Sequence, residues 1–447
     1  MRRNDLLGWF VFAVVALSPI PLGSNPPIFW AISGTLVGLV SLVYFGQVMM
    51  SGEGLRFPVR GIRLLALLFA ALVIFLLVQT LPIGVLLGPF QFASGREGEV
   101  EAQTLSLAPG STWMMVIRML SYGLFFLLVA QVGANERRAE KLMTFIFWSV
   151  VAHGAFGLIQ LTQLGDTLLG AEKTYYQGVA TGTFVNRNSY ATFMAMGMAI
   201  GMGVVVQAIL EISNGVRRLG EALPGLAAVI GGLLVILLAL AASQSRMGLL
   251  SAIVAICVVI LLALRWIRWS SVPQLLIFGF ALATAVGATL LYFGPDLIER
   301  IVMTEATGGG RTFIYDQTLD MIRTRTWTGY GGGAFELAFP LFQAPPLNPD
   351  FLFDKAHSTY LTLWVELGLI AGSLPIAIVA LLFGAIVVQY FRIDIAVGVK
   401  IGAIGAIVAA ALHSTIDFSL EMQANTYLFV AMLGLARSVA ARRRHEP

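Results

Sequence analysis

The sequence has little charge and almost no cysteine. Asp, Glu, Lys and Arg make up 12% of its 447 residues, about half the share typical of a soluble domain. The single cysteine, Cys257, lies inside an apolar run, which excludes a disulfide framework and a cysteine metal site. The remainder is strongly apolar, with 58% hydrophobic residues and a mean hydropathy of +0.85. This composition predicts a protein that crosses a membrane several times.

About twelve apolar segments are long enough to cross a bilayer as helices. We expect the first to remain in the protein as an uncleaved span. The last two are short. The segments are Leu6–Leu22, Ile28–Met50, Leu64–Leu86, Trp113–Val132, Leu142–Leu164, Tyr190–Leu210, Leu223–Ala242, Met247–Leu264, Leu275–Phe293, Leu369–Phe391, Ile401–Leu412 and Thr426–Ala436.

The flanking charges predict the orientation of these segments. If the N-terminus is cytoplasmic, the inward loops and ends hold 18 of the 28 basic residues, and 16 of the 24 acidic residues lie outward. Every short inward loop carries at least two positive charges, as the positive-inside rule requires. The sequence pI of about 9.3 is therefore assigned to membrane flanks, and nucleic acid is not expected as a partner. We predict transmembrane helices in residues 1–293, an outward loop at 294–368, and further spans with a basic cytoplasmic tail at 369–447.

The most polar part of the chain is Arg311–Gly368. It concentrates charged residues and a histidine with a glycine run, and its members are Arg311, Arg323, Arg325, Lys355, His357, Glu366 and Gly331–Gly333. Polar, glycine-rich backbone of this length cannot lie in hydrocarbon, because its amide groups would lack hydrogen-bond partners. A histidine near several arginines suits general-base chemistry beside an anionic group. The glycine run most simply predicts a tight turn, with close approach to phosphate as the alternative.

Three shorter polar stretches are predicted on the same outward side. They are GTFVNRNS with Asn186, Arg187 and Asn188, SQSRM with Arg246, and HSTIDF with His413 and Asp417. If the last stretch is helical, its histidine and aspartate share a face. His413 is either an accessory of the site or a structural hydrogen-bond partner of Asp417. The outer compartment supplies no nucleotide sugars, so a transferase there needs a donor that arrives activated. A lipid-linked diphosphate is such a donor, and arginine is well suited to bind it.

Together these stretches resemble the O-antigen ligase/polymerase family of bacterial envelope glycosyltransferases. The resemblance rests on GTFVNRN, SQSRMG, WTGYGGG after Arg311, and AHSTYL followed by ELGL, with PLGSNPP and HSTIDF near the two ends. They occur in the same order and predicted topology along nearly the whole chain.

The resemblance implies an all-α integral membrane protein of the GT-C type, with a large periplasmic loop carrying short helices, in the bacterial inner membrane. It implies a transferase without metal or cofactor that moves a glycan from undecaprenyl diphosphate to an acceptor hydroxyl, with inversion. His357 would be the general base, and Arg187 and Arg246 would bind the diphosphate. The other implied substrate-binding residues are Asn186, Asn188, Arg311, Lys355 and His413. We expect Lys355 to keep the imidazole neutral by repulsion.

Several functions stay open at the level of sequence. The acceptor is a lipid A core sugar in a ligase, a second lipid-linked repeat in a polymerase, and a protein in an O-oligosaccharyltransferase. A polysaccharide transporter would also have many spans, but transporters usually show internal repeats and mid-membrane ionisable residues. This chain shows no clear repeat, and its polar residues gather toward one predicted face. These features favour an enzyme over a transporter or a non-catalytic scaffold.

Overall fold

The computed structural model describes residues 3–92, 100–266, 309–348 and 350–439. Helices dominate this part of the chain, and two short antiparallel hairpins accompany them, pairing Phe90 with Ala102 and Thr167 with Glu172. The elements are α1 (Arg3–Leu17), η1 (Leu22–Ser24), α2 (Pro27–Met50), η2 (Val59–Ile62), α3 (Arg63–Thr80), α4 (Gly84–Leu87), β1 (Phe90–Phe92), β2 (Val100–Ala102), α5 (Pro109–Gly133), α6 (Glu136–Thr162), β3 (Thr167–Leu168), β4 (Ala171–Glu172), α7 (Arg187–Ser213), α8 (Leu219–Ala242), α9 (Arg246–Ala263), α11 (Gly309–Thr324), α12 (Phe335–Ala338), η4 (Phe339–Leu341), α13 (Thr359–Arg392), α14 (Val397–His413), η5 (Ser419–Glu421) and α15 (Gln423–Ser438).

Among the described residues, eight helices are long and apolar enough to cross a membrane. They are α2, α3 with the η2 turn before it, α5, α6, α7, α8, α9 and α13. The predicted first, eleventh and twelfth spans correspond to α1, α14 and α15, which have 15, 17 and 16 residues. The predicted ninth span lies outside the described residues. The prediction of a polytopic helical membrane protein is therefore confirmed, and the count of twelve stays a prediction.

Helix α7 is the centre of the bundle and is buried along most of its length. It packs closely against α14 through glycines. A Cβ atom on Gly203 would lie 2.5 Å from the carbonyl oxygen of Gly398 and 2.8 Å from the Cα atom of Gly402. Small residues at such crossings allow two helix backbones to approach within van der Waals contact, which stabilises helix pairs in lipid. Any larger side chain at Gly203 would force α7 and α14 apart.

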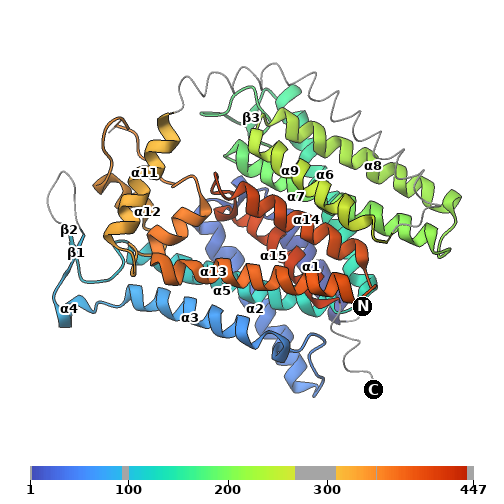
Figure 1. The fold of residues 1–447 in the computed structure, drawn as a ribbon, viewed down its shortest axis with the longest axis horizontal. Coiled ribbons are helices and arrows are strands. Elements are labelled where there is room, and N and C mark those ends of the chain that lie inside the picture. Colours follow the sequence, from blue (N-terminus) through green and yellow to red (C-terminus); the bar gives the residue numbers. More distant parts are fainter. Residues whose placement is uncertain (1–2, 93–99, 267–308, 349, 440–447) are drawn as a thin grey trace.

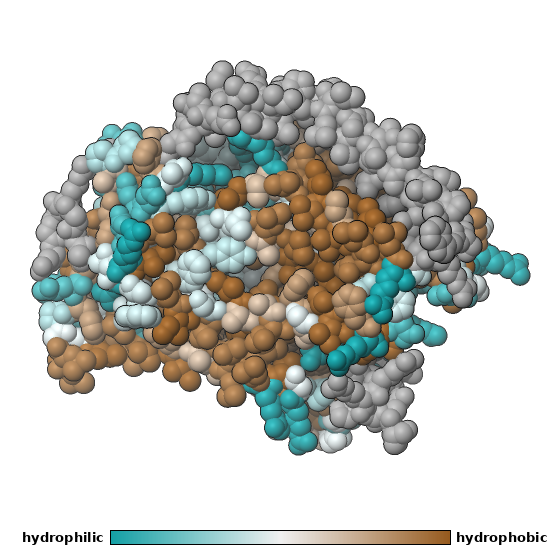
Figure 2. Space-filling view, viewed as in Figure 1, coloured by the Kyte–Doolittle hydropathy of each residue, from teal (hydrophilic) through white to brown (hydrophobic). Residues whose placement is uncertain are grey.

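The outer surface of the bundle is apolar, as a lipid-facing surface requires. Large hydrophobic side chains such as Leu42, Leu67 and Leu261 are exposed by 73%, 68% and 67%. Figure 2 shows this surface as a broad brown area, with hydrophilic side chains gathered mainly toward its edges. A water-soluble protein rarely exposes so large a continuous apolar surface, so the pattern agrees with a membrane location.

The two ends of the bundle differ in what they carry (Figure 1). The N-terminus lies at one end, where Arg3 pairs with Glu53 and Arg138 with Asp5. Helices α11 and α12 and the β1–β2 hairpin lie at the opposite end. The predicted inward and outward segments are thus separated along the bundle.

The glycine run forms a structural joint between the polar segment and α13. The main-chain N–H groups of Tyr330 and Gly331 donate to the carbonyls of Val365 and Glu366, both at 2.9 Å. Gly368 interrupts α13 with φ +73, and a Cβ atom there would lie 2.4 Å from the carbonyl oxygen of Trp327. Glycine is needed at such a position because other residues rarely adopt this backbone conformation. Helix α13 therefore begins at Thr359, earlier than the predicted Leu369, and breaks where the polar segment was expected to end.

The orientation predicts which end is accessible from outside the cell. With Cys257 replaced by Ser, a cysteine at Leu352, which is 63% exposed, should react with an impermeant thiol reagent on intact spheroplasts. A cysteine at Val216, which is 76% exposed between α7 and α8, should react only after permeabilisation, because the positive-inside rule places it in the cytoplasm. The reverse pattern would show that the assigned orientation is wrong.

Candidate active site

Three helices begin with residues that the sequence analysis selected. Arg187 is the first residue of α7, Arg246 is the first residue of α9, and His357 lies two residues before α13. Each helix has a side-chain cap, because Asn186, Ser245 and Ser358 accept hydrogen bonds from main-chain N–H groups of the first turn. The start of a helix carries a partial positive charge and attracts anions. An arginine in the first turn adds its own positive charge to that of the helix start, which suits an anion-binding role.

Asn188 connects the starts of α7 and α9 to the turn after α14. Its Oδ1 atom accepts a hydrogen bond from the Ser245 hydroxyl at 2.9 Å, and its Nδ2 atom donates to Asp417 Oδ2 at 2.9 Å. Both ends of this amide are engaged within the protein. The structure thus gives Asn188 a positioning role, and its predicted contact with substrate stays a prediction.

Asp417 holds the start of α13 through its main chain. Its carbonyl oxygen accepts from the N–H group of Thr359 at 3.1 Å and from the Thr359 hydroxyl at 3.2 Å. Burial raises the pKa of the Asp417 carboxyl to about 6, although hydrogen bonds from Ser419 and Asn188 oppose this shift. The hydrogen bonds from Asn188 through Asp417 to Thr359 form one continuous path, so the three helix starts are joined.

His357 has the environment of a neutral base. Its backbone lies in the left-handed region at φ +53, which is unfavourable for a residue with a side chain and is found most often at functional sites. Its ring packs edge-on against Phe418 with 5.4 Å between ring centres, and the Tyr315 hydroxyl donates to its carbonyl oxygen at 2.9 Å. Burial lowers the pKa of His357 to about 4, with a further contribution from Arg311 and an opposing one from Asp354. The imidazole is therefore neutral at physiological pH and able to accept a proton.

The expectation that Lys355 keeps His357 neutral is wrong. Lys355 forms an ion pair with Glu421, with 3.3 Å between Nζ and Oε2. Burial alone would lower its pKa, but Glu421, Glu366 and Asp354 outweigh that effect and raise it. Its charge is thus balanced by carboxylates, and burial and Arg311 are what keep the histidine neutral. A direct contact between Lys355 and substrate stays a prediction.

His413 and Asp417 do not lie on one face of a helix, which was one arrangement considered from the sequence. Helix α14 ends at His413, so the two residues do not share a helix face. Instead the Ser419 hydroxyl lies 3.4 Å from His413 Nδ1 and donates to the Asp417 carboxylate. His413 is only 1% exposed. This burial favours the structural hydrogen-bond alternative, while binding of substrate by His413 stays a prediction.

Arg311 is exposed on the first turn of α11, and its charge reaches the same region. It lowers the pKa of His357 and of the Asp417 carboxyl, and it acts likewise on the Tyr176 phenol. Arg187 also lies near that phenol, with its guanidinium carbon 5.5 Å from the ring centre. Sequence reasoning missed Tyr176, since nothing in its local sequence separates it from other loop tyrosines.

The amides of the glycine run are used inside the protein. The N–H group of Gly331 donates to the Glu366 carbonyl at 2.9 Å, and that of Gly332 donates to Gln79 Oε1 at 3.2 Å. The Glu366 carboxylate accepts the N–H group of Phe335 at 3.4 Å, at the start of α12. These partners favour the tight-turn interpretation over phosphate binding. Glu366 orients the polar segment, as a buried hydrogen-bond acceptor should.

Comparison with known families supports the resemblance for one part of the chain. The family model described as O-Antigen ligase matches residues 231–376. This segment is similar to the O-antigen ligase family. This confirms the resemblance seen in the sequence. The O-antigen ligase segment contains Arg246, Arg311, Lys355 and His357, whereas Arg187 and His413 lie outside it.

No curated protein matches the chain. Within the described residues, no group of three His, Cys, Asp or Glu side chains could hold a metal ion. Independence of metal stays an expectation from the family resemblance.

Asn188 should be needed to keep the three helix starts together. Replacing it with Ala removes a donor to the buried Asp417 carboxylate, which should cost about 1–3 kcal/mol of stability. The midpoint of thermal unfolding in detergent should fall, and transferase activity should fall with it. Asn214 follows the other end of α7 and is exposed, so Asn214→Ala is the matched control and should change neither. An unchanged midpoint in Asn188→Ala would show that the connection does not stabilise the site.

Proposed function

We propose that this protein is an O-antigen ligase-type glycosyltransferase of the bacterial inner membrane. It transfers a glycan from undecaprenyl diphosphate to a hydroxyl of the lipid A core, on the periplasmic face. In this proposal residues 294–368 form the catalytic loop, between membrane spans in residues 1–293 and 369–447. The observation that carries the proposal is the path of hydrogen bonds that joins the starts of α7, α9 and α13. Arg187 begins α7, Arg246 begins α9, and His357 lies two residues before α13.

In this proposal the arginines bind the donor diphosphate. Arg187 and Arg246 begin neighbouring helices whose N-terminal dipoles also favour an anion. Guanidinium groups bind phosphate oxygens in a bidentate way, and such charge-assisted bonds strengthen as negative charge collects on the leaving group. Arg311 adds a third positive charge from α11. The arginines would therefore stabilise the departing lipid diphosphate in the transition state more than in the ground state, which lowers the barrier.

His357 would act as the general base that takes the proton from the hydroxyl of the acceptor sugar. The acceptor hydroxyl oxygen attacks the anomeric carbon, the bond from that carbon to the phosphate oxygen breaks, and its electron pair leaves with undecaprenyl diphosphate. The hydroxyl proton passes to the neutral imidazole, and attack opposite the leaving group inverts the anomeric centre. A donor diphosphate beside Arg311 would also offset the charge that lowers the histidine pKa. Donor binding would thus strengthen the base when it is needed.

The two proposed roles predict different losses. His357→Ala should reduce turnover by roughly 10²–10⁴-fold, as loss of a general base does, while donor binding is retained. Arg246→Ala should weaken binding of undecaprenyl diphosphate glycan by about 1.5–3 kcal/mol, and Arg246→Lys should restore part of it because lysine lacks the planar fork. The measurements are equilibrium binding of the donor and transfer of a labelled glycan by the purified protein.

Controls and acceptors make this test decisive. Arg323 is exposed and pairs with Asp320 on α11, so Arg323→Ala should resemble wild type. Wild-type protein is given lipid A core, a second lipid-linked repeat, or an acceptor protein in separate reactions. Transfer to the lipid A core supports the ligase, and transfer to either alternative reassigns the acceptor. Absence of transfer to all three, or full activity in Arg246→Ala, contradicts the proposal.

The lowered pKa of His357 predicts an unusually acid-tolerant enzyme. The quantity kcat/KM for the donor reports ionisation of the free enzyme. It should stay level from pH 7 to about 5 and fall as the pH drops through about 4, where the imidazole becomes protonated. An unperturbed histidine would lose activity near pH 6.5.

Asp417 needs a separate control in this experiment, because its carboxyl has a pKa of about 6. Asp417→Asn keeps the shape of the side chain and one of its two acceptor oxygens but removes the ionisation. An acid limb near pH 4 that persists in Asp417→Asn belongs to His357. A wild-type limb near pH 6.5 would contradict the buried, neutral base.

A further inference from the structure

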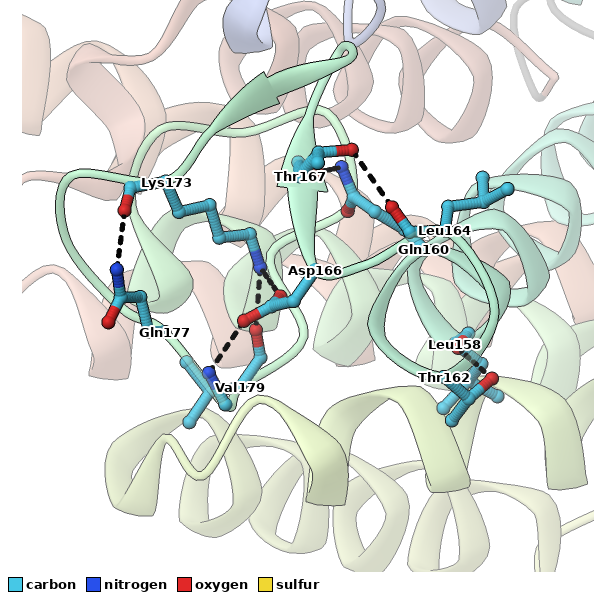
Figure 3. Close-up of polar contacts among 10 residues, drawn as sticks. Leu158, Gln160, Thr162, Leu164, Asp166, Thr167, Lys173, Gln177 and Val179 are labelled. Carbon is cyan, nitrogen blue, oxygen red and sulfur yellow. Dashed lines mark hydrogen bonds and ion pairs between the residues drawn. The ribbon is translucent and has the colours of Figure 1, made fainter.

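The loop between α6 and α7 is held in one conformation by a buried ion pair. Lys173 is only 3% exposed and pairs with Asp166, and its Nζ atom also donates to the Val179 carbonyl at 2.9 Å (Figure 3). The other oxygen of that carboxylate accepts the N–H group of Gly178 at 2.6 Å. A buried lysine is rarely tolerated without such partners. Lys173 and Gly178, on either side of residues 174–177, are thus tied to one carboxylate.

This fixed loop presents Tyr176 to the candidate site. Tyr176 lies between Lys173 and Gln177, whose side-chain amide donates to the Lys173 carbonyl at 3.0 Å. Its backbone has φ +61, a left-handed conformation that is unfavourable for an aromatic residue. Such strain persists where the surrounding structure over-determines it, and it concentrates at ligand-binding sites. The loop therefore holds this tyrosine in a strained backbone conformation, which costs conformational free energy.

The ring and hydroxyl of Tyr176 both contact the start of α7. The guanidinium carbon of Arg187 lies 5.5 Å from the ring centre, within the range of a cation–π interaction. The Asn186 amide donates to the Tyr176 hydroxyl at 3.3 Å. Asn186 Oδ1 meanwhile caps α7, so one amide couples the tyrosine to the helix start. A phenol that accepts a hydrogen bond can still donate its own hydrogen.

Two of the charges that act on Tyr176, those of Arg311 and Asp354, also act on His357. Burial raises the pKa of the Tyr176 phenol, Arg187 and Arg311 oppose this, and Asp417 and Asp354 add to it. The phenol thus remains a protonated donor at neutral pH, and of the charged groups around it Arg187 and Arg311 would favour an anionic ligand. This is the arrangement that a hydrogen-bond donor to a phosphate oxygen needs.

We propose that the Tyr176 hydroxyl donates a hydrogen bond to a non-bridging oxygen of the donor diphosphate bound at Arg187. This inference rests on the proposed function and adds a binding residue that lies outside the matched O-antigen ligase segment. Through the strained loop, the α6–α7 connection would contribute to recognition of the diphosphate.

Tyr176→Phe tests the hydroxyl while keeping the ring on Arg187. We expect the dissociation constant of undecaprenyl diphosphate glycan to rise about 10-fold or more, as loss of a hydrogen bond to a charged group does. The KM for the acceptor and the thermal unfolding midpoint should stay at wild-type values. Tyr175 is the adjacent tyrosine and is 71% exposed, so Tyr175→Phe is the matched control and should bind the donor as wild type does.

The outcomes separate this inference from the proposed function. Unchanged donor binding in Tyr176→Phe, with an active wild type, overturns the inference alone. A lowered unfolding midpoint with a proportionate loss of all activities also overturns it, because the hydroxyl would then be structural. Wild-type protein that neither binds nor uses the diphosphate donor overturns the proposed function and this inference together.

Discussion

The arrangement of the candidate site depends on the buried carboxylate of Asp417. Removing a carboxylate from water is unfavourable unless hydrogen bonds replace its hydration. Here Asn188 and Ser419 donate to the carboxylate, and Thr359 donates to the main-chain carbonyl of the same residue. Asn188 and Asp417 are 229 positions apart in the sequence. One satisfied polar group thus fixes the relative positions of helix starts that no local interaction could join.

Two kinds of close packing keep this arrangement rigid. Glycines let α7 and α14 approach at backbone distance, so the helix that carries Arg187 is held along its length. The main-chain hydrogen bond from Gly331 to Glu366 joins the polar segment to α13, the helix that follows His357. Interiors packed in this way do not deform continuously. The histidine and the arginine are therefore held on elements that cannot drift apart without breaking contacts.

Charged residues in the candidate site lie at the starts of helices. Arginines begin α7 and α9, where the helix dipoles are also positive, and the nearby histidine is kept neutral. Lys355 does not add to this charge, because Glu421 pairs with it. Lys355 and Glu421 thus form an ion pair, while the two arginines lie at helix starts. The field of charged groups is weakly screened near a membrane, where water is partly excluded.

The sequence alone determined the class of protein and most of the residues that gather at the site. Long apolar runs and flanking charges are local properties, so composition was enough to predict a helical membrane protein, and the motifs pointed to Arg246, His357 and the family. Only the tertiary structure decided how these residues meet. It moved the start of α13 to Thr359, paired Lys355 with Glu421 and brought Tyr176 to Arg187. Those outcomes depend on which distant segments pack together, and hydropathy and helical periodicity carry no information about partners far along the chain.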